Sequence, residues 1–222
     1  MNKLIVIEGT DCSGKQTQSE LLRDNLTKLD YKIAKFGFPV YDSPTGRIVG
    51  ECYLGKGGNG FFSEGAVNVD DRVAGLYFAA DRLYNIPKVK ELLQDSNVVL
   101  DRYVDSNLAH QGAKEETREG REKVFKFFET LEYNLLGLPK PDIRILLYMP
   151  SEYAKLLKAN RPEKPDEHER DENYLHRSEE CYLELAKRNN FNIINCVKDG
   201  VVRTIEDIQN ELLNVIISKL DK

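Results

Sequence analysis

The feature that most constrains this chain is a glycine-containing turn between an apolar run and an amphipathic segment. Residues 4–8 form a short, largely β-branched apolar run, residues 18–29 carry leucines at helical spacing, and between them stands Gly9-Thr10-Asp11-Cys12-Ser13-Gly14-Lys15. This is the G-x-x-x-x-G-K pattern in its strand–loop–helix context. Such a loop turns successive backbone N–H groups toward one anion, and the helix amino terminus adds partial positive charge. The sequence therefore predicts a nucleotide-phosphate site over residues 9–17.

The end of this loop departs from the usual pattern. Lys15 is expected to reach the β- and γ-phosphates as a catalytic point charge. The next residue is normally Ser or Thr, whose hydroxyl binds Mg²⁺, but here it is Gln16, and a hydroxyl follows only at Thr17. Asp11 needs a donor partner, because a carboxylate inside a phosphate loop is repelled by the ligand. A sugar hydroxyl or an arginine on the acceptor side would supply that donor.

Four further apolar runs of strand length recur between segments with helical periodicity, at residues 32–36, 98–101, 143–148 and 192–196. Most are apolar on both faces, as strands buried between two layers of helices are. The alternation predicts an α/β fold of three layers with a doubly wound parallel sheet. Ligands of such sheets bind beyond the carboxyl ends of the strands.

The size and charge of the chain narrow its class. Its 222 residues suit a single domain over residues 1–222. A formal net charge of −5 disfavours a nucleic-acid partner. The four cysteines form no CxxC motif, and the apolar run at the amino terminus is too short for a signal peptide or a membrane span. We therefore expect a cytoplasmic protein that binds neither membrane nor nucleic acid.

Residues that could bind a second, acceptor ligand follow the third strand and lie on a predicted helix. Asp101 and Arg102 end the run 98–101, where Asp101 can hold Mg²⁺ through water and Arg102 can bridge phosphates bidentately. Phe78 and Arg82 share a helix face at i, i+4, so the pair can stack on a base and bond its edge. Taken alone, a core phenylalanine beside a partly exposed arginine is the commoner meaning of that spacing.

The type of acceptor follows from the residues that are available to hold it. A phosphate acceptor is already an anionic nucleophile, whereas a nucleoside hydroxyl needs a carboxylate to take its proton. Arg82 and Arg102, with Arg47 nearby in sequence, favour a nucleoside monophosphate. A GTP-dependent switch would need an Asn-Lys-x-Asp guanine reader, and residues 195–199 do not supply it.

Together these segments resemble the thymidylate kinase family over essentially the whole chain. The matching segments, in order, are residues 7–15 (IEGTDCSGK), 38–39 (FP), 76–82 (LYFAADR), 101–112 (DRYVDSNLAHQG) and 182–186 (YLELA). The resemblance implies a P-loop kinase fold with a five-stranded parallel sheet and a mobile lid. It also implies transfer of the γ-phosphoryl group of ATP to dTMP, a requirement for Mg²⁺, and a homodimer.

The resemblance also implies roles for the residues of a thymine site. Phe78 would stack on the base, and Arg82 and Gln111 would read its edge. Asn107 would lie near the base, in a position often held by serine, and Phe38 would belong to the substrate site.

Other roles concern the sugar, the phosphates and the lid. Tyr103 would crowd the 2′ position and favour deoxyribose, Asp11 would meet the 3′-hydroxyl, and Arg102 would hold phosphates. The charged run at residues 160–172 resembles the family's lid, which otherwise would be a solvated loop. Its catalytic arginine would be Arg161 or Arg170, with Arg177 as a third candidate.

The chain departs from the family pattern beside the Phe-Pro segment. Many relatives carry an arginine there, but here Phe38-Pro39 is followed by Val40-Tyr41-Asp42. This departure and Gln16 leave the acceptor preference open. UMP, CMP or a deoxynucleoside remain alternative acceptors for a kinase of the same fold.

Overall fold

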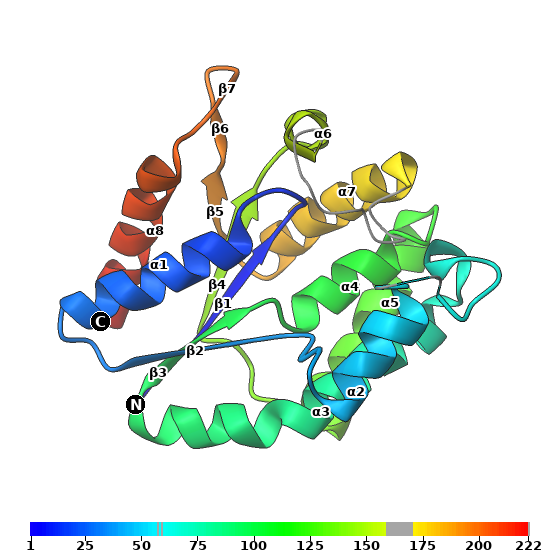
Figure 1. The fold of residues 1–222 in the computed structure, drawn as a ribbon, viewed down its shortest axis with the longest axis horizontal. Helices are drawn as coiled ribbons and strands as arrows, with labels where there is room; N and C mark the ends of the chain where they lie inside the picture. The colour runs from blue at the N-terminus through cyan, green and yellow to red at the C-terminus, as the bar shows by residue number, and fades with distance from the viewer. Residues whose placement is uncertain (57, 59, 159–170, 222) are drawn as a thin grey trace.

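The computed structural model describes residues 1–56, 58, 60–158 and 171–221, and its centre is a five-stranded parallel sheet (Figure 1). The strands are β1 (Leu4–Gly9), β2 (Ile33–Gly37), β3 (Asn97–Asp101), β4 (Ile143–Tyr148) and β5 (Asn192–Asn195). Their order is β2-β3-β1-β4-β5, and every neighbouring pair is parallel. The predicted doubly wound sheet is confirmed, and each apolar run coincides with one of these strands.

Helices cover both faces of the sheet (Figure 1). One face carries α1 (Lys15–Lys28) and α8 (Ile205–Leu220), and the other carries α3 (Asp71–Asp95), α4 (Val104–Gly112), α5 (Arg118–Glu129) and α7 (Glu172–Arg188). Alternate residues of β1 belong to the two different cores: Leu4 and Val6 to the core under α3, α4, α5 and α7, and Ile5 and Ile7 to the core under α1 and α8. This burial on both faces explains why the strands read as continuous apolar runs.

Several short elements were not predicted from the sequence. They are α2 (Pro44–Arg47), the π-helix η1 (Ile48–Tyr53), the 3₁₀ turn η2 (Ala66–Asn68), α6 (Ser151–Lys158), and the antiparallel pair β6 (Val197–Lys198) and β7 (Val201–Val202). The π-helix η3 (Thr130–Leu135) falls within the helical periodicity of residues 124–136. Two-residue strands and single π turns are too short to leave a periodic pattern.

The strand register brings three carboxyl ends to one edge of the sheet. Asp101 at the end of β3 lies opposite Ile7 of β1 and opposite Gly37 of β2. The backbone N–H of Phe38 then donates to the carbonyl of Asp101 at 3.0 Å. The phosphate loop, the Asp-Arg segment and the Phe-Pro segment therefore start side by side. No helix in the described ranges combines the length and apolar character needed to cross a membrane.

Candidate active site

The loop after β1 wraps around the amino terminus of α1. Cys12 and Gly14 adopt left-handed backbone conformations, with φ of 56° and 73°. The Ser13 hydroxyl donates to the carbonyl of Thr10 at 2.7 Å, and the Thr10 hydroxyl donates to the carbonyl of Met149 at 2.7 Å. Gly14 gives α1 no side-chain cap, so the first N–H groups of the helix are directed into the loop. An arrangement of this kind is suited to binding an anion.

Lys15 is the first residue of α1 and is buried within the loop. Its Nζ donates to the carbonyls of Gly9 and Thr10, each at 2.9 Å. Burial lowers the pKa of Lys15 to about 8, and the nearby Arg102 cation acts in the same direction. An incoming phosphate would supply the negative charge that this ammonium needs.

The carboxylates near the loop suit a metal that also binds nucleotide phosphates. Gln16 and Thr17 are exposed, and the Gln16 amide lies 3.4 Å from the Glu20 carboxylate. Asp11 and Asp101, in contrast, lie close enough to Lys15 to oppose the lowering of its pKa. No cluster of three or more His, Cys, Asp or Glu that could hold a metal occurs in the described part of the chain. Mg²⁺ needs only one or two carboxylates when phosphates and water complete its shell, so these residues fit it.

Arg102 sits at the turn between β3 and α4. Its backbone is left-handed, with φ of 65°, and its N–H donates to the carbonyl of Ile7 at 3.0 Å. Its Nη1 donates to the hydroxyls of Ser106 at 3.2 Å and Tyr182 at 3.3 Å. Burial alone would lower the pKa of Arg102, but nearby Tyr182 and Glu8 raise it, so the side chain stays cationic. The sequence predicted Arg102 at the carboxyl end of this strand, but it did not predict that the hydroxyls of Ser106 and Tyr182 hold its side chain.

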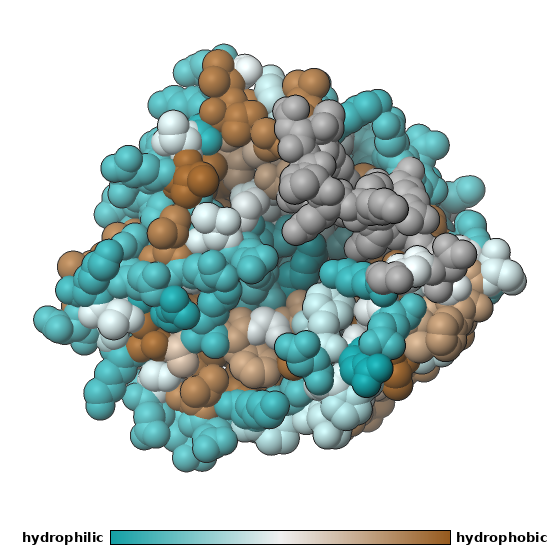
Figure 2. Space-filling view, viewed as in Figure 1, coloured by the Kyte–Doolittle hydropathy of each residue, from teal (hydrophilic) through white to brown (hydrophobic). Residues whose placement is uncertain are grey.

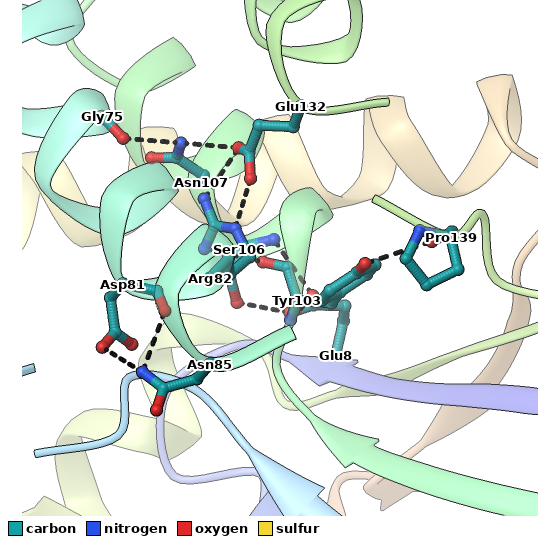
Figure 3. A network of polar contacts seen from close by, with 10 residues as sticks. All are labelled: Glu8, Gly75, Asp81, Arg82, Asn85, Tyr103, Ser106, Asn107, Glu132 and Pro139. Carbon is teal, nitrogen blue, oxygen red and sulfur yellow. Dashed lines mark hydrogen bonds and ion pairs between the residues drawn. The ribbon is translucent and has the colours of Figure 1, made fainter. Parts of the chain in front are cut away.

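Glu8 fixes this turn from beneath (Figure 3). Its carboxylate is fully buried and accepts the backbone N–H groups of Tyr103 at 2.8 Å and Ser106 at 3.0 Å, as well as the Ser106 hydroxyl. Burial raises the pKa of Glu8, and so does the nearby Asp105 carboxylate. Glu8 belongs to a matched segment, but the sequence analysis assigned it no role.

A pocket of about 680 Å³, counted with its open mouth, lies beside the phosphate loop. All eight residues expected to contact the acceptor line it: Asp11, Phe38, Phe78, Arg82, Arg102, Tyr103, Asn107 and Gln111. The lining also includes Pro39, Tyr41, Leu54, Ser106, His110 and Leu175, none of which had been assigned a contact. Figure 2 shows a hollow at the centre of this face with mainly hydrophilic side chains around it.

The pocket lining includes an aromatic ring and an unpaired amide. Phe78 lies on α3, with its ring centroid 5.7 Å from that of Tyr53 in a T-shaped contact. Gln111 on α4 is fully buried, and neither its Oε1 nor its Nε2 has a partner among the described residues. A buried amide left unpaired costs free energy that a ligand edge can recover. The pocket can therefore hold a planar, hydrogen-bonding ring.

Arg82 has a buried partner that the sequence analysis missed. Both its Nε and Nη2 donate to the carboxylate of Glu132, the latter at 2.7 Å, and its Nη1 lies 3.5 Å from the carbonyl of Tyr103 (Figure 3). Burial would lower the pKa of Arg82, but the Glu132 carboxylate raises it. Asn107 donates to the same carboxylate at 3.0 Å.

A second buried carboxylate holds the outer wall of the pocket. Asp81 accepts the backbone N–H of Val40 at 2.9 Å and so holds the segment after the cis peptide bond Phe38–Pro39. Tyr103 packs against this wall, with its ring centroid 5.9 Å from that of Phe38. The Tyr103 hydroxyl donates to the carbonyl of Pro139 at 3.1 Å. The expected contact of Tyr103 with the 2′ position stays a prediction.

His110 is a pocket residue that helical spacing could have revealed. It follows Asn107 by three positions and precedes Gln111 by one, on the face of α4 that lines the pocket. Its ring stacks on Tyr174 with centroids 6.0 Å apart. Burial lowers the pKa of His110 to about 3, aided by the nearby Arg102 cation. The imidazole is therefore neutral at physiological pH.

The two remaining predicted arginines that the structure describes, Arg47 and Arg177, do not line the pocket. Arg161, Arg170 and nearly all of the expected lid lie outside the described residues. The Nε of Arg177 donates to the carbonyl of Ala113 at 2.6 Å. Arg47 is exposed and pairs with Glu51 at 2.9 Å. Arg47 therefore does not replace the arginine missing after the Phe-Pro segment.

A phosphate loop at the end of β1, beside a pocket for a ring-bearing acceptor, is the arrangement of a P-loop nucleotide kinase. Residues 7–208 match the sequence model of the family described as Thymidylate kinase. The chain belongs to the thymidylate kinase family and is an enzyme of the nucleoside monophosphate kinase type.

Individual relatives agree with this membership. A probable thymidylate kinase of Methanocaldococcus jannaschii is 32% identical over 97% of this chain and 96% of its own length. The thymidylate kinase of Mycobacterium tuberculosis is 33% identical over 82% of this chain and 85% of its own length. A solved thymidylate kinase of Candida albicans has the same fold, with a TM-score of 0.73 and 24% identity over 98% of this chain and 92% of that chain.

Proposed function

We propose that this protein, acting as one domain, transfers the γ-phosphoryl group of ATP to dTMP, giving dTDP and ADP for dTTP synthesis. The observation that carries the proposal is the unpaired, buried Gln111 amide in the same pocket as Phe78 and Asp11 of the phosphate loop. A thymine ring would stack on Phe78 and satisfy both atoms of the amide. Arg82 would contribute its Nη1 to the same edge.

Two cationic side chains, those of Lys15 and Arg102, would bind the phosphates. Lys15 would leave the carbonyls of Gly9 and Thr10 for the β- and γ-phosphates of ATP, whose negative charge stabilises the ammonium. Arg102 would hold the phosphates of donor and acceptor together, at a position fixed by Glu8. The acceptor phosphate is itself the nucleophile, so no side chain has to remove a proton.

Other residues of the same site would contact the sugar and the metal. Asp11 would accept the 3′-hydroxyl and Tyr103 would exclude a 2′-hydroxyl, since both line the pocket. Asp101 would hold Mg²⁺ through water. Gln16 and Thr17 are exposed, which agrees with a metal that keeps water in its coordination shell. When bound, the metal would neutralise developing phosphate charge.

A homodimer is proposed from one face of α3. Val73, Leu76, Leu83 and Tyr84 are 42%, 48%, 44% and 58% exposed and recur at helical spacing. An apolar stripe of this kind favours burial against a second copy. Light scattering on the wild type and on Leu83→Glu tests this, since the variant should shift the mass toward the monomer. We further propose a cytoplasmic location.

The activity is tested by measuring ADP release from ATP and Mg²⁺ with dTMP, dUMP, UMP, CMP, AMP and thymidine. The highest kcat/KM is expected for dTMP. Faster turnover of thymidine or of a ribonucleotide would refute the proposal. Lys15→Ala should abolish transfer with every acceptor, which separates true transfer from contaminating activity.

A further inference from the structure

We propose that Glu132 is a positioning residue that locks the amide of Asn107, so that the pocket accepts a base bearing a ring N–H and rejects cytosine. The inference rests on the proposed function, because it concerns how the same pocket chooses its pyrimidine. Glu132 would not touch the substrate. It would act by fixing which atom of Asn107 faces the base.

The starting point is an ion pair with no exposure to water. The side chains of Arg82 and Glu132 are 3% and 0% exposed. Desolvation offsets much of the attraction within such a pair, so a buried pair is weak evidence for a role in stability. Arg82 and Asn107 line the acceptor pocket and Glu132 contacts both, which makes orientation of these two groups the more informative role.

The orientation of Asn107 follows from its partners (Figure 3). Its Nδ2 donates to the carbonyl of Gly75 at 3.1 Å and to Oε1 of Glu132 at 3.0 Å, which uses both N–H groups of the amide. A flipped amide would turn its oxygen toward two acceptors, because a carbonyl and an ionised carboxylate only accept. The flip is therefore excluded while both Glu132 oxygens act as acceptors, as they do in the pairing with Arg82.

The consequence is a fixed acceptor at the pocket wall. Asn107 is 3% exposed and lines the pocket, and its Oδ1 has no hydrogen-bond partner within the described ranges. A base is bound well only if it presents a donor to this oxygen. Thymine and uracil carry an N–H at ring position 3, whereas cytosine carries a lone pair there, which would face Oδ1 and leave both atoms unsatisfied.

Gln111 cannot make this distinction alone. Both atoms of its amide lack partners among the described residues, so either orientation is open to it. An amide that is free to turn can serve a thymine edge or a cytosine edge. The selection between them therefore depends on Asn107, and through Asn107 on Glu132.

The experiment measures kcat/KM of the full-length enzyme for dTMP, dUMP, dCMP and N3-methyl-dTMP. The wild type should use dTMP and dUMP and should discriminate against the other two by a factor of about ten to a hundred or more, as expected for an unpaired buried group. Glu132→Gln should reduce the preference for dTMP over dCMP by about tenfold, since a glutamine N–H can support the flipped Asn107. The KM for ATP should change little.

The control is Glu129→Gln, one turn earlier, which removes a carboxylate from Arg188 at 2.7 Å but lies away from the pocket. It should leave the ratio of dTMP to dCMP unchanged. Asn107→Ala should lower that ratio by itself, and Glu132→Gln added to Asn107→Ala should lower it no further, because Glu132 acts through Asn107.

Three results would overturn the inference. One is a wild type that uses dCMP or N3-methyl-dTMP as well as dTMP. Another is an Asn107→Ala enzyme with unaltered selectivity, which decides the matter even if Glu132→Gln fails to fold. The third is a multiplicative effect in the double variant. A wild type that phosphorylates none of these nucleotides would instead contradict the proposed function itself.

Discussion

Asp81→Asn should separate the acceptor pocket from the ATP site. The carboxylate is 1% exposed and accepts four hydrogen bonds: from Val40 N–H at 2.9 Å, Ser43 Oγ at 3.1 Å, Thr45 Oγ1 at 2.9 Å and Asn85 Nδ2 at 3.0 Å. An asparagine has one oxygen, so its N–H₂ must face at least one of these donors. The segment from Phe38 to Arg47, of which Phe38, Pro39 and Tyr41 line the pocket, is thereby loosened from α3.

The expected size of the effect follows from those bonds. Losing a charged acceptor and leaving a buried donor unpaired costs about 2 kcal/mol. For a domain of this size that lowers Tm by about 4–8 °C, and if half of the cost falls on substrate binding, kcat/KM for dTMP falls about fivefold. The KM for ATP should stay within about twofold, since Asp81 contacts no residue of the phosphate loop.

The measurements are a thermal melt and separate titrations of dTMP and ATP in the coupled ADP-release assay. Asp95→Asn makes the same chemical change at an exposed position near the end of α3 and should leave Tm and both constants unaltered. Equal changes in the two KM values, or a Tm equal to that of Asp95→Asn, would refute the assignment of Asp81 to the acceptor wall.

Three further outcomes are expected. The pKa of Lys15 is lowered to about 8, and only its ammonium form binds phosphate well, so the Kd for ATP should rise above pH 8 by up to about tenfold per pH unit. Calorimetry measures this Kd, and a Kd that stays constant up to pH 9.5 would contradict the prediction. Gly75→Ala should lower the free energy of unfolding in urea by about 1–3 kcal/mol, because the new Cβ would overlap the Phe128 ring. Glu8→Gln should lower kcat about tenfold with little change in the KM for ATP or dTMP. The reason is that the turn carrying Arg102 loses an acceptor for the backbone N–H groups of Tyr103 and Ser106. A change in KM alone would mean that Glu8 does not position Arg102.

The sheet could be predicted because its strands are buried on both faces. Runs such as 143–148 alternate between two apolar cores, so the sequence carries a continuous signal that is independent of the neighbouring strands. The β6–β7 pair left no such signal, since two residues per strand cannot show a period. The π-helices η1 and η3 look like ordinary helix in the sequence, because a π-helix differs from an α-helix in its backbone hydrogen bonds, which join i to i+5 in place of i+4.

The phosphate loop could be predicted because its parts are contiguous. Gly9 to Lys15 carry the loop geometry within seven neighbouring positions, and the strand and helix that give it meaning stand on either side. The acceptor pocket is assembled from segments far apart in the chain. Phe78, Arg82 and Arg102 were proposed from their positions in the sequence, whereas Phe38, Tyr103, Asn107 and Gln111 came from the resemblance alone. The partners of those members were missed: Arg82 and Glu132 are 50 positions apart, and Arg102 and Tyr182 are 80 apart.

A rule about buried charges could have predicted the contact between Arg82 and Glu132. Phe125, Phe128 and Glu132 recur at i, i+3 and i+7, which places a carboxylate on the apolar face of an amphipathic segment. Arg82 occupies the same kind of position on its own helix, between the buried Ala79 and Ile86. A charge at a core position must find a partner of opposite sign, since an isolated one costs too much to bury. When two helices each carry one such charge, and the charges have opposite sign, the rule predicts that the two side chains contact each other. Buried ion pairs of this kind are expected beside functional pockets.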